Sequence, residues 1–420
     1  MSTMHRDSAL RKRLLPLHAA VALQGAVLWY PVEKLFMSEI GFDALTFGVM
    51  AAAYAAMAPL VEIPSGILAD RWSRRGVLIV SSTALALGSL IGGLSDNVTV
   101  YVLSALIFGV YFAMFSGTLD AILYDTVLEE TASSESFEKR LGRIRFTESS
   151  ALVLSALAGG WLADVTTPRF TYFVTVPLAA LSIVAYLRFR EPRLHRAEVA
   201  VPVRRQIAMT YRTITGRGRL LPIVILVVLT GLTLNAIFEF GPLWLVSLAV
   251  PAVLFGPHWA GLMTTLGLGG LLAGRLRLDQ PVPLMVVVTL MLAGAVTLSM
   301  PVGFVAVTVA QIVLALLLVV ASIHVTRLLH DAVPSKIRSG VASGVSALSW
   351  IAFLPFALIF GVVNKYQGVN AAGWMIVAVT VVVGVLLLAA TRRPPPQVAA
   401  EGSGSAATPT REDVAATVER

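Results

Sequence analysis

The sequence predicts an all-α membrane protein of twelve transmembrane helices, arranged as two pseudo-symmetric six-helix bundles. Three observations carry this prediction. Of the 420 residues, 57% are hydrophobic and only 13% are charged, a composition far from that of soluble domains. Apolar runs of about 20 residues, the length that crosses a bilayer, recur almost throughout the chain. Basic residues gather in short clusters in alternate connections between these runs. The chain is therefore expected to face lipid.

Polar residues, glycine and proline mark the ends of the predicted helices. The first six are expected at residues 14–37, 44–69, 76–94, 99–124, 143–164 and 168–189. The second six are expected at residues 220–246, 256–275, 282–300, 302–326, 339–363 and 371–391. The apolar run from Leu14 to Leu35 is too long for the core of a signal peptide, so it is interpreted as a retained first helix.

The distribution of lysine and arginine predicts the orientation. With twelve spans, 29 of the 32 basic residues fall on the side that also holds both termini. The exceptions are Lys34, Arg169 and Lys365. Cytoplasmic loops carry the excess of basic residues in membrane proteins. Both termini are therefore predicted to be cytoplasmic, in a multi-pass protein of the cytoplasmic membrane.

Four regions follow from this division of the chain. Residues 1–189 form the N-terminal bundle, 190–219 a basic cytoplasmic linker, 220–391 the C-terminal bundle, and 392–420 a disordered cytoplasmic tail. The linker is predicted from a cluster of nine arginines between Arg188 and Arg219. It is expected to contact anionic lipid headgroups. The net charge of +8 lies in such short loops, so a nucleic-acid partner is not expected.

The stretch GILADRWSRRG, from Gly66 to Gly76, connects the second and third predicted helices. The three arginines satisfy the topology rule, but Asp70 does not contribute to it. A carboxylate at a helix end can face the positive end of a neighbouring helix or pair with an arginine. Such contacts hold one arrangement of a bundle and break in another.

This stretch resembles the G-x-L-x-D-R-x-G-R-R signature of the major facilitator superfamily. The matching residues are Gly66, Leu68, Asp70, Arg71, Arg74 and Arg75, and Ser73 stands where the family usually has glycine. The resemblance implies the major facilitator fold, covering about residues 10–392, and transport by alternating access. It also implies that Asp70 and the arginines form a conformational latch on the inner side.

Three further segments, VEIPSGILADR, DAILYDTV and AGGWLAD, are similar to those of bacterial efflux members of the family. Two features depart from that pattern. Gly159 and Gly160 are not followed by the Gly-Pro pair of drug antiporters, and the fourth helix lacks the arginine of many proton-coupled members. The sequence favours proton-coupled efflux of a hydrophobic or cationic organic compound. The alternatives are proton-coupled uptake of a small metabolite, or a lipid-moving or non-transporting membrane protein.

Carboxylates inside predicted spans are costly, so each needs a cavity, a partner or a function. Glu33 and Glu239 occupy equivalent places in the first and seventh helices and are candidates for proton coupling or cation recognition. Alternatively, Glu33 pairs with the adjacent Lys34, or both acids reach the outer headgroups. Glu62 and Asp120 are further candidates for proton coupling or substrate contact, and Glu62 precedes Pro64, which is expected to kink its helix toward the cavity.

Glu62, Asp120 and Glu148 lie near the predicted inner ends of their helices, where Arg143 and Arg145 are available, with Glu62 the expected exception. These residues are interpreted as an inner salt-bridge network that belongs to the latch and changes during transport. Static pairing at the headgroups is the alternative.

Aromatic and amide side chains inside the spans suggest a broad, mostly apolar cavity. The candidates are Gln24, Trp29, Tyr30, Tyr54, Tyr111, Asn235, Phe238, Trp244, Gln311 and Trp350. Aromatic belts at the bilayer interfaces are the alternative for about half of them. No Walker loop, metal-binding triad or nucleophile constellation occurs, so no enzyme activity, cofactor or metal is expected. The expected partners are a small-molecule substrate, protons and membrane lipids, and we expect a monomer.

Overall fold

The computed structural model describes residues 3–115, 118–131, 137–192, 220–273, 275–333 and 338–392. Among the helical residues, the side chains of 3–8, 58–59, 62–67, 69–71, 138–139, 330, 338–340, 342–343 and 391–392 lie outside this description. Most of the predicted linker and nearly all of the predicted tail also lie outside the described residues. Every element in the described part of the chain is helical.

The N-terminal half begins with an interrupted helix. Its elements are α1 (Thr3–Gly25), the 3₁₀ turn η1 (Tyr30–Val32), α2 (Glu33–Glu39), α3 (Ala44–Arg71), α4 (Arg74–Leu94), α5 (Val98–Phe115), α6 (Thr118–Thr131), α7 (Phe137–Val165) and α8 (Pro168–Arg188). The first predicted span corresponds to α1, η1 and α2 together, and the fourth corresponds to α5 and α6.

The C-terminal half contributes six further helices. They are α10 (Leu221–Ser247), α11 (Ala252–Ala273), α12 (Pro281–Leu298), α13 (Phe304–Ala332), α14 (Arg338–Gln367) and α15 (Val369–Arg392). Within the described residues, nine helical segments are long and apolar enough to cross a membrane by themselves. Counting α1 to α2 and α5 to α6 as one rod each, the two halves hold six rods apiece.

The first span is broken where the sequence predicted one continuous helix. Helix α1 ends at Gly25, and the chain resumes in η1 and α2 after four residues. Pro31 supplies no amide hydrogen and disfavours helical geometry in the residue before it. Other helices satisfy the freed backbone groups: the Leu28 amide donates to Thr175 Oγ1 at 3.2 Å, and Ser155 Oγ donates to the Gly25 carbonyl at 3.1 Å. Such breaks are tolerated in a membrane when neighbouring helices supply partners.

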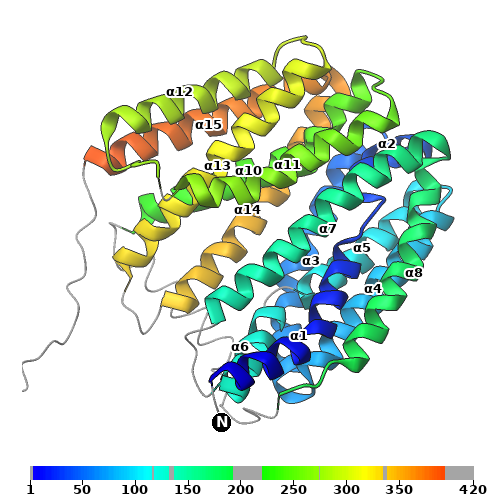
Figure 1. Cartoon of the computed structure of the whole chain (residues 1–420). Helices are drawn as coiled ribbons and strands as arrows, with labels where there is room; N and C mark the ends of the chain where they lie inside the picture. The colour runs from blue at the N-terminus through cyan, green and yellow to red at the C-terminus, as the bar shows by residue number, and fades with distance from the viewer. Residues whose placement is uncertain are drawn as a thin grey trace, which may run out of the picture.

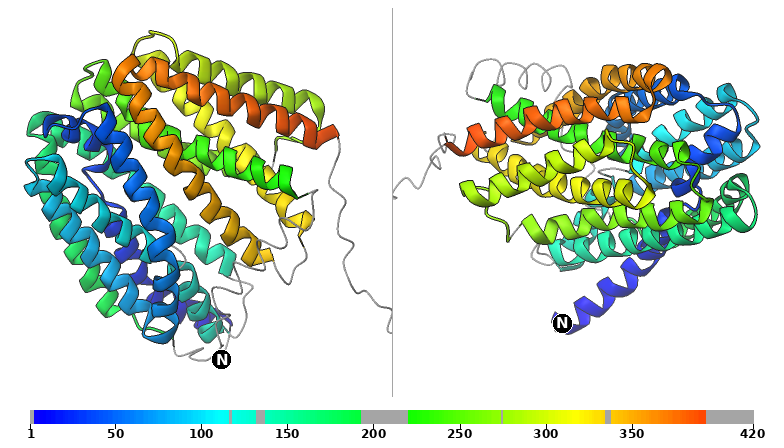
Figure 2. Two further views of the ribbon diagram at one scale, coloured as in Figure 1. Left: turned by 180° about the vertical axis from the view of Figure 1, so that it is seen from behind. Right: turned by 90° about the horizontal axis from the view of Figure 1, so that it is seen from above.

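The two halves lie side by side at one end of the molecule and diverge toward the other (Figure 1). Seen from behind, they separate in the same direction (Figure 2). We call the end that holds α2 and the start of α3 the far end. The end that holds α6 and the start of α4, with Arg74, Arg75 and Arg145, is called the basic end. Helix α3 packs on α14 and helix α7 packs on α11 across the two halves.

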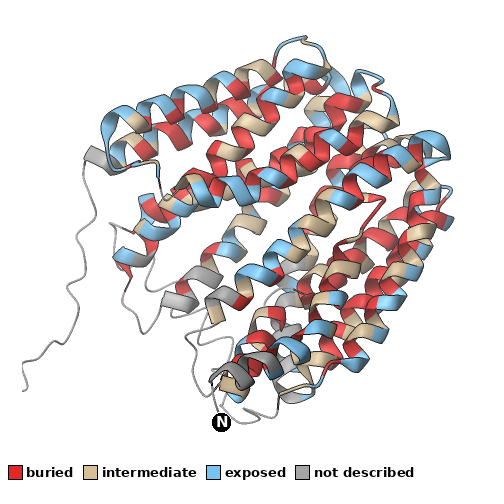
Figure 3. Ribbon diagram, in the orientation of Figure 1, coloured by how far each residue is buried: buried red, intermediate tan, exposed pale blue. Residues whose placement is uncertain are grey.

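Buried residues run through the centre of each half, and exposed residues cover the outer faces of the helices (Figure 3). Many of the exposed residues are large and apolar, such as Leu271 at 70% exposure and Val305 at 70%, as expected for surfaces that face lipid. In the N-terminal half, the buried Trp29 stacks between Phe108 and Tyr172, with ring centroids 4.3 Å and 5.0 Å away. This aromatic stack fixes the interrupted segment from which the functional site is built.

Candidate transport site between the two halves

Glycines bring the halves into close contact at the far end. A Cβ atom on Gly48 of α3 would lie 2.5 Å from the carbonyl oxygen of Ala357 on α14, and one on Gly160 of α7 would lie 2.6 Å from the amide nitrogen of Gly256 on α11. Because no side chain fits there, the backbones touch directly, as in small-residue contacts between membrane helices. The far end is therefore closed by helix packing.

A buried ion pair joins the halves beneath these contacts. Lys34 Nζ on α2 lies 2.5 Å from Glu239 Oε1 on α10 and 3.2 Å from Oε2 of the adjacent Glu33. The Lys34 side chain is only 4% exposed. One lysine thus neutralises one of two glutamates, and the group carries a net charge of −1 when both acids are ionised. Glu33 and Glu239 share one cation, an arrangement that the sequence did not predict.

Glu33 is also held within its own half. Tyr101 donates a hydrogen bond to Glu33 Oε1 at 3.0 Å, and the hydroxyls of Tyr101 and Tyr172 share a hydrogen bond of 2.7 Å. Both tyrosines are buried. Glu239 belongs to the C-terminal half, whereas Glu33 and Lys34 belong to the N-terminal half. Within this group, the contact between Lys34 and Glu239 is the one that joins the two halves.

A second ion pair crosses the halves at the rim of the far end. Lys365 Nζ on α14 lies 2.9 Å from Asp43 Oδ2, just before α3. Asp43 also caps α3, because Oδ1 accepts from the Thr46 amide at 2.9 Å. The hydrogen bonds from Lys365 and Thr46 lower the pKa of Asp43 to about 2. The carboxylate therefore stays charged throughout the pH range in which cells live.

Below the closed end, the structure holds an aromatic cavity of about 370 Å³ between the halves. We call it the aromatic lobe. Its walls include Trp29, Tyr30, Tyr111, Phe112, Phe115, Phe238 and Trp259. Tyr30 and Trp259 meet edge to face across the halves, with centroids 4.9 Å apart. Among the described residues of its lining, Glu148 is the one charged side chain.

Glu148 belongs to a second cluster with a net charge of −1. Arg145 donates to Glu148 Oε2 at 2.9 Å and to Asp120 Oδ1 at 2.8 Å. All three residues come from the N-terminal half, on α6 and α7. The predicted pairing of Asp120 and Glu148 with an arginine is present, but it joins no residue of the C-terminal half. Arg143 is exposed, and its side chain makes no ion pair within the described residues.

Two further cavities adjoin the aromatic lobe. The charged lobe, about 130 Å³, is lined by the Glu33, Lys34 and Glu239 group together with Tyr54 and Trp350. The hydroxyl lobe, about 370 Å³, lies within the C-terminal half between α10, α13 and α14. Asn235 of α10 lines all three lobes. The side-chain carboxamide of Asn235 therefore lies where the three lobes meet.

The basic end holds ion pairs within the N-terminal half only, as far as the described residues go. Arg74 pairs with the buried Asp125 and donates to the Ala121 carbonyl at 3.1 Å. Arg75 donates to the Phe189 carbonyl at 3.2 Å. Ser73 caps α4 by accepting from the Gly76 amide at 2.8 Å, so the departure from the family pattern has a structural role. Gly66, Asp70, Arg71 and Glu62 lie outside the described side chains.

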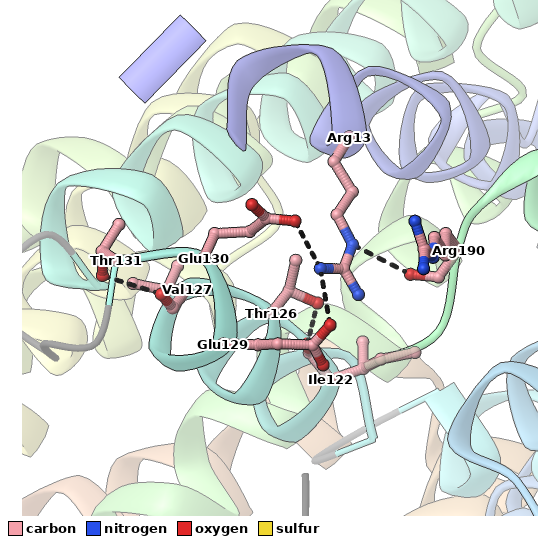
Figure 4. A network of polar contacts seen from close by, with 8 residues as sticks. All are labelled: Arg13, Ile122, Thr126, Val127, Glu129, Glu130, Thr131 and Arg190. Atoms are coloured by element: carbon pink, nitrogen blue, oxygen red, sulfur yellow. Dashed lines mark hydrogen bonds and ion pairs between the residues drawn. The ribbon is translucent and has the colours of Figure 1, made fainter. Parts of the chain in front are cut away.

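A further polar network joins α1, α6 and the segment after α8 at the same end (Figure 4). Arg13 of α1 reaches Glu129 and Glu130 of α6, at 3.1 Å and 2.6 Å, and donates to the carbonyl of Arg190 after α8 at 3.2 Å. These contacts hold the N-terminal half together as one body. The conformational latch remains a prediction, because its aspartate is not described.

Two predicted cavity residues must be corrected. Gln24 is buried in the N-terminal half, where it donates to Ser82 Oγ at 2.8 Å and accepts from Tyr186 at 2.5 Å. Gln311 is buried in the C-terminal half and donates to the Gly241 carbonyl at 3.1 Å. Neither lines any of the three lobes. Gln24 thus has hydrogen-bond partners for both ends of its amide within its own half, whereas Gln311 Oε1 is buried without a hydrogen-bond partner among the described residues.

Trp244 is also buried within its half and donates to the Leu298 carbonyl at 2.8 Å. By contrast, the other predicted cavity residues do line the lobes: Trp29, Tyr30, Tyr54, Tyr111, Asn235, Phe238 and Trp350. Sequence reasoning named Lys34 only as an alternative partner of Glu33 and missed its bridge to Glu239, and it missed Trp259 entirely. The sequence signal for Lys34 was that it is one of only three basic residues predicted on the side opposite the basic clusters. In the described residues, no cluster of histidine and acidic residues is suited to hold a metal ion.

Comparisons with known proteins agree with this architecture. Multidrug resistance protein 2 of Bacillus subtilis is 28% identical over 172 residues, which are 40% of this chain and 41% of that protein. Quinolone resistance protein NorA of Staphylococcus aureus is 22% identical over 163 residues, 39% of this chain and 40% of that protein. The similar region thus spans about two fifths of the length of these relatives.

Solved structures extend the likeness to nearly the whole chain. The nucleoside transporter NupG superposes with a TM-score of 0.74 at 14% identity, covering 91% of this chain and 99% of that one. A D-xylose–proton symporter gives a TM-score of 0.69 at 13% identity, with 91% and 98% covered. These likenesses confirm the predicted twelve-helix fold in two six-helix bundles. A family model described as Major Facilitator Superfamily matches residues 14–326, and the chain therefore belongs to the Major Facilitator Superfamily of membrane transporters.

Proposed function

We propose that this chain is a proton-coupled exporter of hydrophobic organic cations. The observation that carries the proposal is the aromatic lobe, whose lining combines seven aromatic side chains with one charged group, Glu148. Aromatic faces and a carboxylate attract organic cations. The similarity to bacterial multidrug and quinolone resistance proteins supports export. The likeness to a symporter rests on the fold alone and does not favour uptake.

In this proposal, the basic end faces the cytoplasm and the structure corresponds to the inward-facing state. The excess of basic residues at that end supports the orientation. The close glycine contacts shut the far end, while the halves diverge toward the basic end (Figure 1). A cation from the cytoplasm or the inner leaflet enters between the halves and reaches Glu148.

Proton coupling is assigned to the Glu33, Lys34 and Glu239 group. Opening the far end separates Lys34 from Glu239, which belong to different halves. Glu239 then faces the outer solution and takes up a proton, while Glu33 keeps Lys34 neutralised within the N-terminal half. When the halves close again, Lys34 returns to Glu239 and displaces the proton, which leaves toward the cytoplasm. One proton thus moves inward per cycle, and the ligand moves outward.

Transport of tetraphenylphosphonium into inverted vesicles or proteoliposomes tests this assignment. An acidic lumen should drive accumulation by the wild-type protein. E239Q should abolish accumulation driven by the pH gradient, because the neutral amide cannot carry the proton, yet it should still exchange labelled for unlabelled ligand. E148Q should weaken binding of the cation about tenfold, the loss expected for one charge-assisted contact.

Glu39 provides the matched control, because it is exposed at the end of α2 and lines none of the three lobes. E39Q should transport like the wild type. If E239Q retained accumulation driven by the pH gradient, the coupling assignment would be wrong. Accumulation only under a gradient of the opposite sign would instead indicate uptake by symport.

A further inference from the structure

The hydroxyl lobe differs in chemistry from the rest of the cavity. Its lining holds four hydroxyl side chains, Ser322 and Thr326 from α13 and Ser346 and Ser349 from α14, together with apolar residues. Among the described residues, no charged side chain belongs to this lining. Residues three or four apart lie on one face of a helix, so Ser322 with Thr326 and Ser346 with Ser349 form two polar faces that line the same space. A lobe of this kind suits a neutral group that forms hydrogen bonds.

The hydroxyls retain capacity for a ligand. Ser322 donates to the Val319 carbonyl at 2.8 Å and Ser349 to the Val345 carbonyl at 3.1 Å, which leaves their oxygens free to accept. Thr326 and Ser346 are exposed, and their side chains make no hydrogen bond within the described residues. They are therefore available as both donors and acceptors.

Asn235 connects this lobe to the cation site. It lines the hydroxyl, aromatic and charged lobes, and its carboxamide makes no hydrogen bond within the described part of the chain. It is half-buried, and a polar group in such a place needs a partner. Water supplies one when the cavity holds no ligand, and a ligand that spans both lobes supplies one when it is bound.

We propose that the hydroxyl lobe is a second subsite, which takes the neutral, hydroxyl- or carbonyl-bearing part of a ligand whose aromatic cationic part occupies the aromatic lobe. This inference rests on the proposed function, because the cation site is part of it. The two lobes have similar volumes of about 370 Å³ each, and together they match the size of typical drug-binding pockets. The preferred substrates are therefore two-part molecules rather than compact aromatic cations.

Two probes separate the subsites in binding measurements on the purified protein. Tetraphenylphosphonium is an aromatic cation without hydrogen-bonding groups, whereas doxorubicin joins an aromatic body and an ammonium group to several hydroxyls and carbonyls. The double variant T326V/S346A should weaken doxorubicin binding about tenfold, the effect of losing two neutral hydrogen bonds. It should change tetraphenylphosphonium binding by less than twofold.

The matched control is T83V/T297V, which removes two hydroxyls from α4 and α12, neither of them in a lobe. It should bind both probes like the wild type. Equal weakening of both probes by T326V/S346A would show a general disturbance and overturn the second subsite. Unchanged doxorubicin binding would also overturn it but leave the proposed function intact. If the wild type bound neither probe, the proposed function and this inference would both fail.

Discussion

At the scale of single residues, three basic side chains at the far end each lie against a carboxylate. Lys34 contacts Glu33 and Glu239, Arg169 lies 2.9 Å from Asp96, and Lys365 lies 2.9 Å from Asp43. These three are the residues that break the alternation of basic clusters along the chain. Two of them, Lys34 and Lys365, bridge the halves. Two of the three basic residues predicted on the side that carries few of them, Lys34 and Lys365, therefore lie at contacts between the halves at the closed far end.

The buried bridge is expected to matter far more than the exposed one. K34Q leaves the carboxylates of Glu33 and Glu239 without their cation at a place where the Lys34 side chain is only 4% exposed. Removing one partner of a buried ion pair typically lowers the free energy of unfolding by about 3 kcal/mol. Thermal unfolding of the purified protein should show a clear fall in Tm for K34Q. The double variant K34Q/E239Q should recover much of the loss, because it leaves only Glu33, which keeps its hydrogen bond from Tyr101.

K365Q is the matched control, since it breaks a cross-half pair at the exposed rim. Exposed pairs contribute little, so its Tm should change much less than that of K34Q. The lowered pKa of Asp43 gives a further check. Because the pKa of Asp43 is lower in the folded protein than in the unfolded chain, where it is near 4, the ionised carboxylate stabilises the folded state at pH values above 4. This stabilisation is lost only as the pH falls toward 2. The difference between K365Q and the wild type should therefore stay constant from pH 8 to pH 5, and a narrowing over that range would contradict the assignment.

The sequence predicted the types of residues in the site better than their partners. All the predicted cavity aromatics except Trp244 line the lobes, because a large amphipathic side chain inside an apolar span often lies at a cavity. Gln24 and Gln311 show the limit of this argument. An amide inside a span needs hydrogen bonds, but nothing in one sequence tells whether a cavity, a serine or a backbone carbonyl provides them.

At the scale of elements, the broken first helix and the glycine contacts determine where the halves meet. The break after Gly25 gives the Leu28 carbonyl room to lie against Gly159 of α7, where a Cβ atom would overlap that oxygen. The apolar run concealed this break, and only Gly25 and Pro31 signalled it. Gly48 and Gly361 were not singled out from the sequence, because their contact depends on two helices from different halves.

Enlarging Gly48 is expected to open the far end. In G48V, the new side chain meets the Ala357 carbonyl and Gly361 backbone, so α3 and α14 cannot close. The chain contains no cysteine, and F238C therefore provides a single reporter in the cavity. A membrane-impermeant maleimide added from the far side should label F238C more in the G48V background than in the wild-type background.

The control is G267V on α11, where a Cβ atom meets nothing within 4 Å. It should leave labelling of F238C unchanged. G48A serves as a milder variant if G48V folds poorly, and it should raise labelling in the same direction. Equal labelling in all backgrounds would mean that the glycine contact does not close the far end.

At the scale of the whole molecule, the fold could be predicted and the conformational state could not. Hydropathy and the alternation of basic clusters are local properties that repeat along the chain, so they predict the number of helices and the two halves. Which end is closed depends on small differences in free energy between two packings of the same halves. The exposed and buried faces in Figure 3 follow from both the fold and this choice of state.

The orientation of the molecule gives the last prediction. Three single-cysteine variants test it. Y366C lies at the far end, where Tyr366 is 77% exposed, and W72C lies at the basic end, where Trp72 is 53% exposed. S346C lies in the hydroxyl lobe. If the basic end is cytoplasmic, an impermeant maleimide should label Y366C in intact cells and W72C in inverted vesicles. S346C should follow W72C, because the halves diverge toward that end (Figure 2). Labelling of W72C from outside would reverse the orientation, and with it the direction of proton movement proposed for Glu239.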